Sequence, residues 1–286
     1  MTTLAAPHLG MSLPIGRLRT LLRYRELIWM LAWRDIRVRY KHSVLGAAWA
    51  VLPPLAMMLI FTFVFGTVTD INRQSLTGHP TLAYPLFAFS GLVPWMFLAN
   101  GLSSATGSLV ANRQLVTKIY FPREVFPISA IMSAFVDFVI AFALLVLMIV
   151  FIHVQSPVWE FRFHWAILLL PVVVAVQICF MVGLGLILSM ANLFYRDVSF
   201  LFRSVVQLWM FVTCVIYQLQ ATDGWKRVAI QLNPMTPIIQ AYRDCLLNGR
   251  SPLNTPFIAT AAFSVGLLLL GWSWFLRRES DFAENI

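Results

Sequence analysis

The sequence predicts an all-α integral membrane protein with six transmembrane helices, an N-terminal amphipathic interface helix, and re-entrant periplasmic helices between the fifth and sixth spans. Three observations carry this prediction. The 286 residues are 59% hydrophobic and only 12% charged, a balance far from that of soluble proteins. Six apolar segments reach the roughly 20 residues that a helix needs to cross the bilayer core. Basic residues gather beside these segments, as they do at the cytoplasmic ends of membrane helices.

The six predicted spans are separated by short polar segments. They cover residues Leu45 to Val68, Tyr84 to Ala111, Pro127 to Ile152, Trp165 to Leu193, Ser204 to Leu219 and Pro256 to Leu276. In the first span, Pro53 and Pro54 lie a few turns in, where proline is expected to kink or break a helix. We expect a single domain over 1–286, with a cytoplasmic N-terminal part at 1–43, the membrane domain at 44–276 and a cytoplasmic tail at 277–286.

The distribution of lysine and arginine predicts the topology. With an odd number of segments before the N-terminus and an even number of spans, 15 of the 21 basic residues fall on the side of both termini and six on the other side. Cytoplasmic flanks are enriched in these residues, so both termini are expected in the cytoplasm of a bacterial inner membrane. The first 20 residues lack the apolar core and cleavage site of a signal peptide.

A basic and aromatic helix is predicted just before the first span. Its apolar stripe consists of Trp29, Trp33, Ile36 and Tyr40, and the basic line beside it of Arg34, Arg37 and Lys41. A second, narrower apolar line consists of Leu27, Leu31 and Val38. Such a helix lies in the membrane plane, against anionic lipid head groups on one side and its own bundle on the other. The alternative is an ordinary basic flank that orients the first span by charge alone.

Asp137 is the only acidic residue well inside a predicted span. A carboxyl group at this depth is costly, so it should face the bundle interior and is a functional candidate. A hydrogen bond across helices, for example to Gln177 or Gln207, explains it equally well. No second intramembrane acid offers a proton relay, which argues against an ion-driven mechanism.

The segment from Gln220 to Arg250 is too polar to cross the membrane but carries many apolar residues. Thr236 and Pro237 are expected to cap and start a helix, and Asn248 with Gly249 to end it. We expect a helical hairpin that dips back into the outer leaflet, with its irregular backbone buried in protein. The alternative is an exposed periplasmic loop.

The cytoplasmic loop Asn112 to Pro127 combines a short helical core with basic and apolar side chains. Such a loop can insert into a groove on a partner and pass its movement into the spans, although a plain basic loop is the simpler explanation. Its candidate contact residues are Arg113, Gln114, Leu115, Lys118, Tyr120 and Phe121.

Aromatic residues concentrate toward the outer ends of three spans. They are Phe61, Phe63 and Phe65 on the first, Phe87, Phe89 and Trp95 on the second, and Trp209, Phe211 and Tyr217 on the fifth. Aromatic faces stack on sugar rings without demanding one linkage, which suits a sliding polymer. The aromatic belt at the membrane surface, or simple core packing, predicts the same clustering.

Several catalytic signatures do not occur in this sequence. It has no GxxxxGK[ST] phosphate loop, no HExxH and no GxSxG. The three cysteines have no metal-site spacing and no disulfide framework. The net charge of +9 is explained by membrane topology rather than by nucleic acid, which we do not expect as a partner. If ATP drives this protein, another polypeptide binds it.

Four stretches in order resemble one family. They are LAWRDIRVRYKHSVLGAAWAVLPPL at 31–55, NRQLVTKIYFPREVFP at 112–127, NLFYRDVSFLFRSVVQLW at 192–209 and NPMTPIIQAYRDCLL at 233–247. Together they resemble the permease subunit of ABC type-2 polysaccharide exporters, which move O-antigen, capsule or teichoic acid. The resemblance covers nearly the whole chain, from about residue 21 to 278.

The resemblance implies a homodimer of six-span subunits joined to two ATP-binding cassette subunits. Its substrate would be a polyprenyl-pyrophosphate-linked polysaccharide, with membrane lipids around it. No cofactor is expected on this chain, because ATP and Mg²⁺ would bind the partner ATPase. The resemblance also implies that Trp29 to Tyr40 is the interface helix, that Arg113 to Phe121 is the coupling helix, that Asn192 to Arg203 is a second cytoplasmic contact, and that the aromatics of the first and fifth spans line the channel.

Two other functions are considered. One is a drug or small-lipid exporter of the same superfamily, from which the outer aromatic cluster distinguishes a glycan exporter only weakly. The other is a membrane-bound acyl- or glycosyltransferase, which needs a catalytic carboxylate or histidine at a membrane face. The candidates for that role are His79, His153 and His164, the last of them near Glu160.

Overall fold

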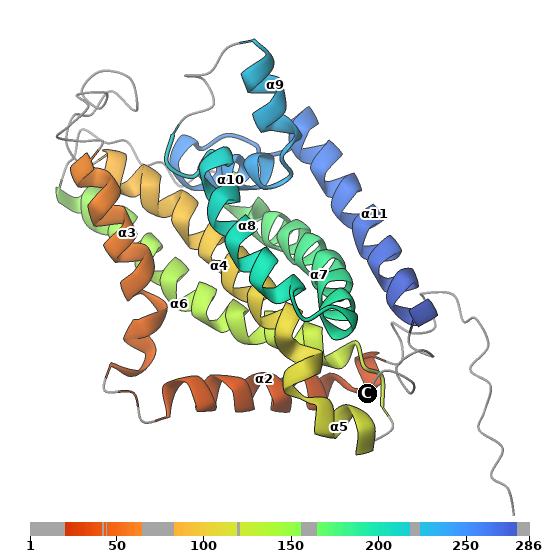
Figure 1. Ribbon diagram of the computed structural model, residues 1–286. Helices are drawn as coiled ribbons and strands as arrows, with labels where there is room; N and C mark the ends of the chain where they lie inside the picture. Colours follow the sequence, from red (N-terminus) through yellow and green to blue (C-terminus); the bar gives the residue numbers. More distant parts are fainter. Residues whose placement is uncertain are drawn as a thin grey trace, which may run out of the picture.

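The structure is a computed structural model in which all the regular structure of the described residues is helical (Figure 1). It describes residues 21–41, 43, 45–64, 83–118, 121–155, 165–217 and 224–278. Four helices in these ranges are long and apolar enough to cross a membrane. The chain is therefore an all-α integral membrane protein.

Helix α4 (Ala83–Ala111) lies at the centre of the bundle. Of its most apolar stretch 78% is buried, against 28–33% for the other three long helices. It packs against α6 (Val125–Gln155), α7 (Leu170–Phe194), α3 (Leu52–Phe63) and α8 (Val198–Val212). Because α4 is enclosed on nearly all sides, its side chains form the core that positions the other helices.

The structure confirms long apolar helices at four of the six predicted spans. They are the second, third, fourth and sixth, which run over Tyr84–Ala111, Val125–Ile152, Trp165–Phe194 and Thr255–Arg278. The fourth begins with a turn of 3-10 helix, η3 (Trp165–Leu169), and continues as α7. The sixth is α11 (Thr255–Arg278), which packs along α7. Uninterrupted apolar runs were sufficient to locate all four.

The first and fifth predicted spans are shorter helices within the described residues. At the first, a 3-10 turn, η1 (Gly46–Ala50), precedes α3, and Pro53 lies in the first turn of α3. The two prolines therefore start this helix instead of kinking it, as expected of a residue with a fixed φ and no N–H. At the fifth, α8 has 15 residues, which makes about 22 Å against a hydrocarbon core of roughly 30 Å.

Helix α2 (Arg25–Tyr40) runs across the foot of the bundle, at a large angle to the long helices (Figure 1). It packs along α6. Its buried residues belong to a second apolar cluster, separate from the main core, which joins α2 to the neighbouring ends of four long helices. That cluster contains Leu21, Leu31, Leu109, Val125, Phe126, Leu186, Met190, Trp272 and Phe275.

The segment after α8 forms two short helices and a π-helical turn, namely α9 (Trp225–Leu232), α10 (Met235–Arg243) and η5 (Asp244–Asn248). Helix α10 is buried along almost its whole length against α4, α7 and α11. Gly249, at φ +60°, ends η5 as predicted. The start differs from the prediction: Thr236 lies inside α10, and the Asn233 side chain instead accepts the Met235 N–H at 3.1 Å.

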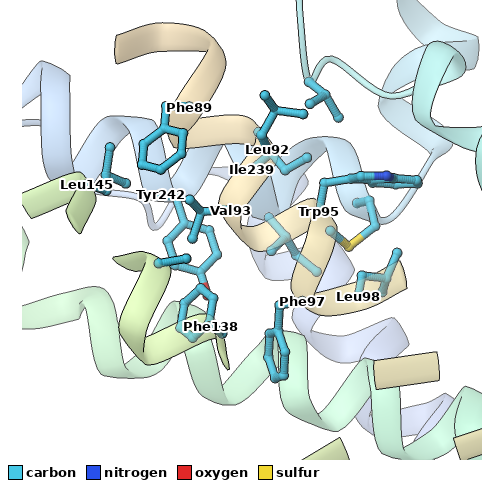
Figure 2. Packing of buried hydrophobic residues seen from close by; sticks show 14 of the residues in the cluster. Phe89, Leu92, Val93, Trp95, Phe97, Leu98, Phe138, Leu145, Ile239 and Tyr242 are labelled. Atoms are coloured by element: carbon cyan, nitrogen blue, oxygen red, sulfur yellow. The ribbon is translucent and has the colours of Figure 1, made fainter. Parts of the chain in front are cut away.

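The main core is built where α4, α6 and α10 meet (Figure 2). Phe138 of α6 packs against Phe97 of α4 at 4.9 Å and against Tyr242 of α10 at 6.2 Å between ring centroids. The Tyr242 hydroxyl donates to Gln177 Oε1 at 2.8 Å, and Gln177 Nε2 donates to the Pro94 carbonyl at 2.8 Å. A buried polar chain thus links α10, α7 and α4 within an apolar core.

Candidate functional site

The outward face of α2 carries the tryptophans that the sequence singled out. Trp29 is 52% and Trp33 42% exposed, and their rings stack with centroids 6.1 Å apart. The Arg37 guanidinium lies over the Trp33 ring at 5.5 Å. Ile36, predicted on the same stripe, is buried with Leu31 and Ala32 against the bundle. The predicted stripe is therefore split: its tryptophans face outward and its isoleucine inward.

The inward end of α2 is held by a charged contact on α6. Arg39 Nη1 pairs with Asp137 Oδ2, and the Tyr40 hydroxyl donates to Asp137 Oδ1 at 2.6 Å. Burial, together with the hydrogen bond to Asp137, raises the pKa of Tyr40 to about 12, so the phenol is a proton donor at neutral pH. The Asp137 side chain is 13% exposed, in agreement with its predicted inward position.

The partners of Asp137 differ from the two amides considered from the sequence. Gln177 is used by Pro94 and Tyr242, and Gln207 is exposed on α8. Arg39 and Tyr40 were assigned to a surface helix, whose depth relative to α6 a helical wheel cannot give.

A polar cavity of about 610 Å³ lies beside this contact, between α2, α4 and α6. Its lining combines two arginines with hydroxyl, amide and small side chains: Arg34, Asp35, Val38, Arg39, Ser103, Ser104, Gly107, Ser108, Ala111, Asn112, Ala130 and Ser133. Arg34 Nη2 donates to Asp35 Oδ1 at 2.8 Å and to Asn112 Oδ1 at 2.8 Å. Asn112, the last residue before α5, therefore connects the predicted coupling loop to α2.

The predicted coupling helix is present as α5 (Arg113–Lys118). Arg113 and Gln114 are exposed, and Leu115 is partly buried against the apolar cluster at the foot of the bundle. Phe121 packs on Phe126 of α6 with ring centroids 5.3 Å apart. Tyr120 and the side chain of Lys118 lie outside the described residues, as do the side chain of Lys41's neighbour His42 and the transferase candidates Glu160 and His164.

The predicted channel aromatics divide into three groups. Phe87, Phe89 and Trp95 are buried core residues of α4. Phe61, Trp209 and Tyr217 are partly buried against the same core, and the Trp209 ring meets the Trp95 ring edge to face at 5.7 Å. Phe63 is 67% and Phe211 57% exposed. Phe65 lies outside the described residues. Only the exposed members offer a surface to a substrate, and that role stays a prediction.

Arg243 forms a second polar site, which sequence reasoning treated only as a loop charge. It is 5% exposed. Its guanidinium donates to the carbonyls of Cys214 at 2.7 Å, Val215 at 2.6 Å and Phe87 at 3.1 Å. These carbonyls lie just after α8 and near the start of α4, so one side chain of α10 ties three segments together. The apolar residues around Arg243, at helical spacing along α10, were the signal that this segment is buried.

Asn233 makes a related contact one turn before α10. Its Oδ1 accepts from Trp209 Nε1 at 3.0 Å, and its Nδ2 donates to Thr213 Oγ1 at 2.7 Å. The Tyr84 hydroxyl of α4 donates to the Ile216 carbonyl at 3.1 Å. The end of α8 is therefore unwound at a fixed place, with its free backbone groups bonded to side chains of α4 and α10.

Among the described residues, no group of three or more histidine, cysteine, aspartate or glutamate side chains is placed to hold a metal ion. The groups that gather here are instead hydrogen-bonding and aromatic side chains around helix ends. Such an arrangement can bind, orient and move segments of the bundle.

Residues 26–247 match the ABC-2 type transporter family. The chain is similar to the O-antigen export system permease protein RfbA of Myxococcus xanthus, with 32% identity over 274 residues that cover 95% of this chain and 100% of the relative. A protein of that name from Klebsiella pneumoniae is 29% identical over 260 residues, covering 91% and 94%. The polysialic acid transport protein KpsM of Escherichia coli is 22% identical over 247 residues, covering 86% and 91%.

Proposed function

We propose, from the premise that this chain belongs to the ABC-2 type transporter family, that it is the membrane-spanning permease subunit of a polysaccharide exporter. The observation that carries this proposal is the similarity over the full length to permeases named for O-antigen export. The capsule-type relative is also a transport protein for a polysaccharide. The family and the named relatives therefore favour a glycan over a drug or small lipid.

The substrate that we propose is a polysaccharide linked to polyprenyl pyrophosphate, moved from the cytoplasmic to the periplasmic side of the bacterial inner membrane. The energy would come from ATP and Mg²⁺ bound to a separate ATPase subunit, because this sequence carries no phosphate loop. Both termini, and with them α2 and α5, would lie on the cytoplasmic side. The enrichment of basic residues beside these elements supports that orientation.

A homodimer with two ATP-binding subunits is the assembly that we propose. Its support is the apolar side of α8, where exposed residues follow helical spacing: Leu201, Val205, Leu208, Phe211 and Val212. Helix α3 carries a similar exposed face with Leu59, Ile60 and Phe63. A passage formed between two copies would use these faces and the exposed aromatics on them, whereas α4 is enclosed within one chain.

The contacts at the foot of the bundle support a role for α2 and α5 as the elements that receive force. Asn112 joins the end of α4 to Arg34 of α2, and α5 follows directly. Movement of α5 would therefore reach both α4 and α2. The outward Trp29 and Trp33, with Arg37, fit the head-group level of the membrane.

The direct test joins genetics with reconstitution. Deletion of the gene should abolish surface polysaccharide, and the purified chain should form a stable complex with the ATPase encoded beside it. In vesicles, the complex should move lipid-linked polysaccharide only when ATP is present and the phosphate-binding lysine of the ATPase is intact. Normal surface polysaccharide after deletion, or export of a drug or small lipid instead of glycan, would overturn the proposal.

A further inference from the structure

Asp137 is the only acidic residue within the four long apolar helices. A carboxylate among apolar side chains is unfavourable unless it is paired and hydrogen-bonded. Both of its oxygens are engaged: one by Arg39 and the other by Tyr40. These two residues are consecutive and form the end of α2, so both partners of the carboxylate belong to one helix.

The two ends of α2 contact the bundle by different kinds of interaction. Toward its start, Leu31 packs into the apolar cluster at the foot of the bundle. Toward its end, the contact is the charged one at Asp137. Apolar contacts are non-directional, so they tolerate sliding and rotation of the helix. A short hydrogen-bonded ion pair has a defined geometry and is stronger where water is scarce.

The surroundings of the pair allow it to open without leaving a charge in an apolar site. Arg39 is 36% exposed. Arg39, together with Ser133, one turn before Asp137 on α6, lines the polar cavity between α2, α4 and α6. A carboxylate released from Arg39 would therefore adjoin hydroxyl groups as well as apolar ones. The contact can accordingly have two arrangements, engaged and separated.

We propose that Asp137 is a positioning residue that, with Arg39 and Tyr40, forms the joint through which movement of α2 is passed to α6. While the joint is engaged, α2 cannot slide or rotate independently of α6. Without it, α2 is still held by apolar contacts but moves on its own. The proposal rests on the proposed function only in assigning the source of that movement to the ATPase.

The first experiment needs no ATPase. Spin labels are placed at Arg37→Cys on α2 and Leu147→Cys on α6, both at exposed positions, after Cys179, Cys214 and Cys245 have been replaced. The distance distribution between the labels in the purified chain should be narrow, and Asp137→Asn should broaden it. The matched control is Asp35→Asn, which removes an acid that pairs with its neighbour Arg34 on α2 itself and should leave the distribution unchanged. An unchanged distribution in Asp137→Asn overturns the proposal.

Milder variants cover the case in which Asp137→Asn does not fold. Tyr40→Phe removes one hydrogen bond and Arg39→Gln removes the charge while both leave the carboxylate in place. Each should broaden the distribution, and each should cause little further change in the presence of the other two substitutions, because the three groups act as one unit. Fully additive changes would overturn the joint.

The second experiment uses the complete complex in vesicles. Asp137→Asn should still bind the ATPase and hydrolyse ATP, while polysaccharide moved per ATP falls roughly tenfold, within the usual range of coupling between sites. Equal losses of hydrolysis and transport, or no loss of either, would overturn the proposal. If the unaltered chain binds no ATPase, the proposed function fails, whereas the label distances still decide whether the joint exists.

Discussion

Arg243 lies over the face of Phe87, with its Cζ atom 3.6 Å from the ring centroid, although the two residues come from α10 and α4 and are 156 positions apart. The same guanidinium holds the two carbonyls that follow α8. Gly91 makes this approach possible, because a Cβ atom there would lie 2.6 Å from Arg243 Nη2 and 2.7 Å from the Val215 carbonyl oxygen. The end of α8 is thus fixed against α4 by a cation with neutral partners.

Replacing Arg243 by methionine should destabilise the protein. The carbonyls of Phe87, Cys214 and Val215 would lose their donor inside the bundle, at a cost of about 1–3 kcal/mol for each group left unsatisfied. Arg243→Lys should recover little, because one ammonium group cannot reproduce the planar fork. Thermal unfolding in detergent measures the effect. Arg203→Met, which alters an exposed arginine near Phe200, is the control and should change stability little.

Asn233→Asp should be more disruptive than its size suggests. Thr213 Oγ1 already donates to the Trp209 carbonyl at 2.8 Å, so it can only accept from Asn233. An aspartate would set two acceptors against each other and place a charge in a buried site, costing about 1–3 kcal/mol. Trp209 donates to the same side chain, so its fluorescence should report the change. An unchanged spectrum and melting temperature would contradict this reading of the contact.

Gly183→Ala should separate α7 from α11. A Cβ atom at Gly183 would lie 2.7 Å from the backbone nitrogen of Leu268, where neither helix can give way without a shift. We expect a loss of about 1–3 kcal/mol, as for other insertions into packed cores. Gly266→Ala on the same α11 is the matched control, because its Cβ meets nothing within 4 Å. That variant should be neutral or gain up to about 1 kcal/mol from helix propensity.

Exposed and buried aromatics should respond differently to alanine. Phe63→Ala and Phe211→Ala remove exposed rings, so they should leave assembly and stability nearly unchanged while lowering polysaccharide export. Phe89→Ala removes a fully buried ring and should cost about 3–5 kcal/mol of stability. The measurements are export in cells and melting temperature of the purified protein. Unimpaired export in the double variant of Phe63 and Phe211 would mean that these rings only face lipid.

The long spans could be predicted because each rests on its own composition. An apolar run of sufficient length makes a buried or lipid-facing helix whatever its neighbours are, and the four helices confirmed here are of that kind. The basic and aromatic pattern at Trp29 to Tyr40 likewise predicted a helix, and the structure has one at Arg25–Tyr40.

The remaining features depend on residues far apart in the chain. The apolar run through Val212 to Tyr217 reads as continuing helix, but it unwinds where Arg243 and Tyr84 bind its carbonyls. Those partners follow or precede it by tens of residues, and no local pattern announces them. The same holds for Asp137, whose partner Arg39 is 98 positions away. Hydropathy located the charge but could not identify which distant group neutralises it.

The enclosure of α4 limits where the bundle can rearrange. Pulling this helix away from its neighbours would wet nearly four-fifths of its most apolar stretch at once, a cost that grows with each square ångström uncovered. Helices α3, α8 and α11 meet the bundle along one side only, so they can swing with far less surface lost. An alternating-access cycle in this chain would therefore turn about α4 as a stationary post, with the opening carried by the periphery.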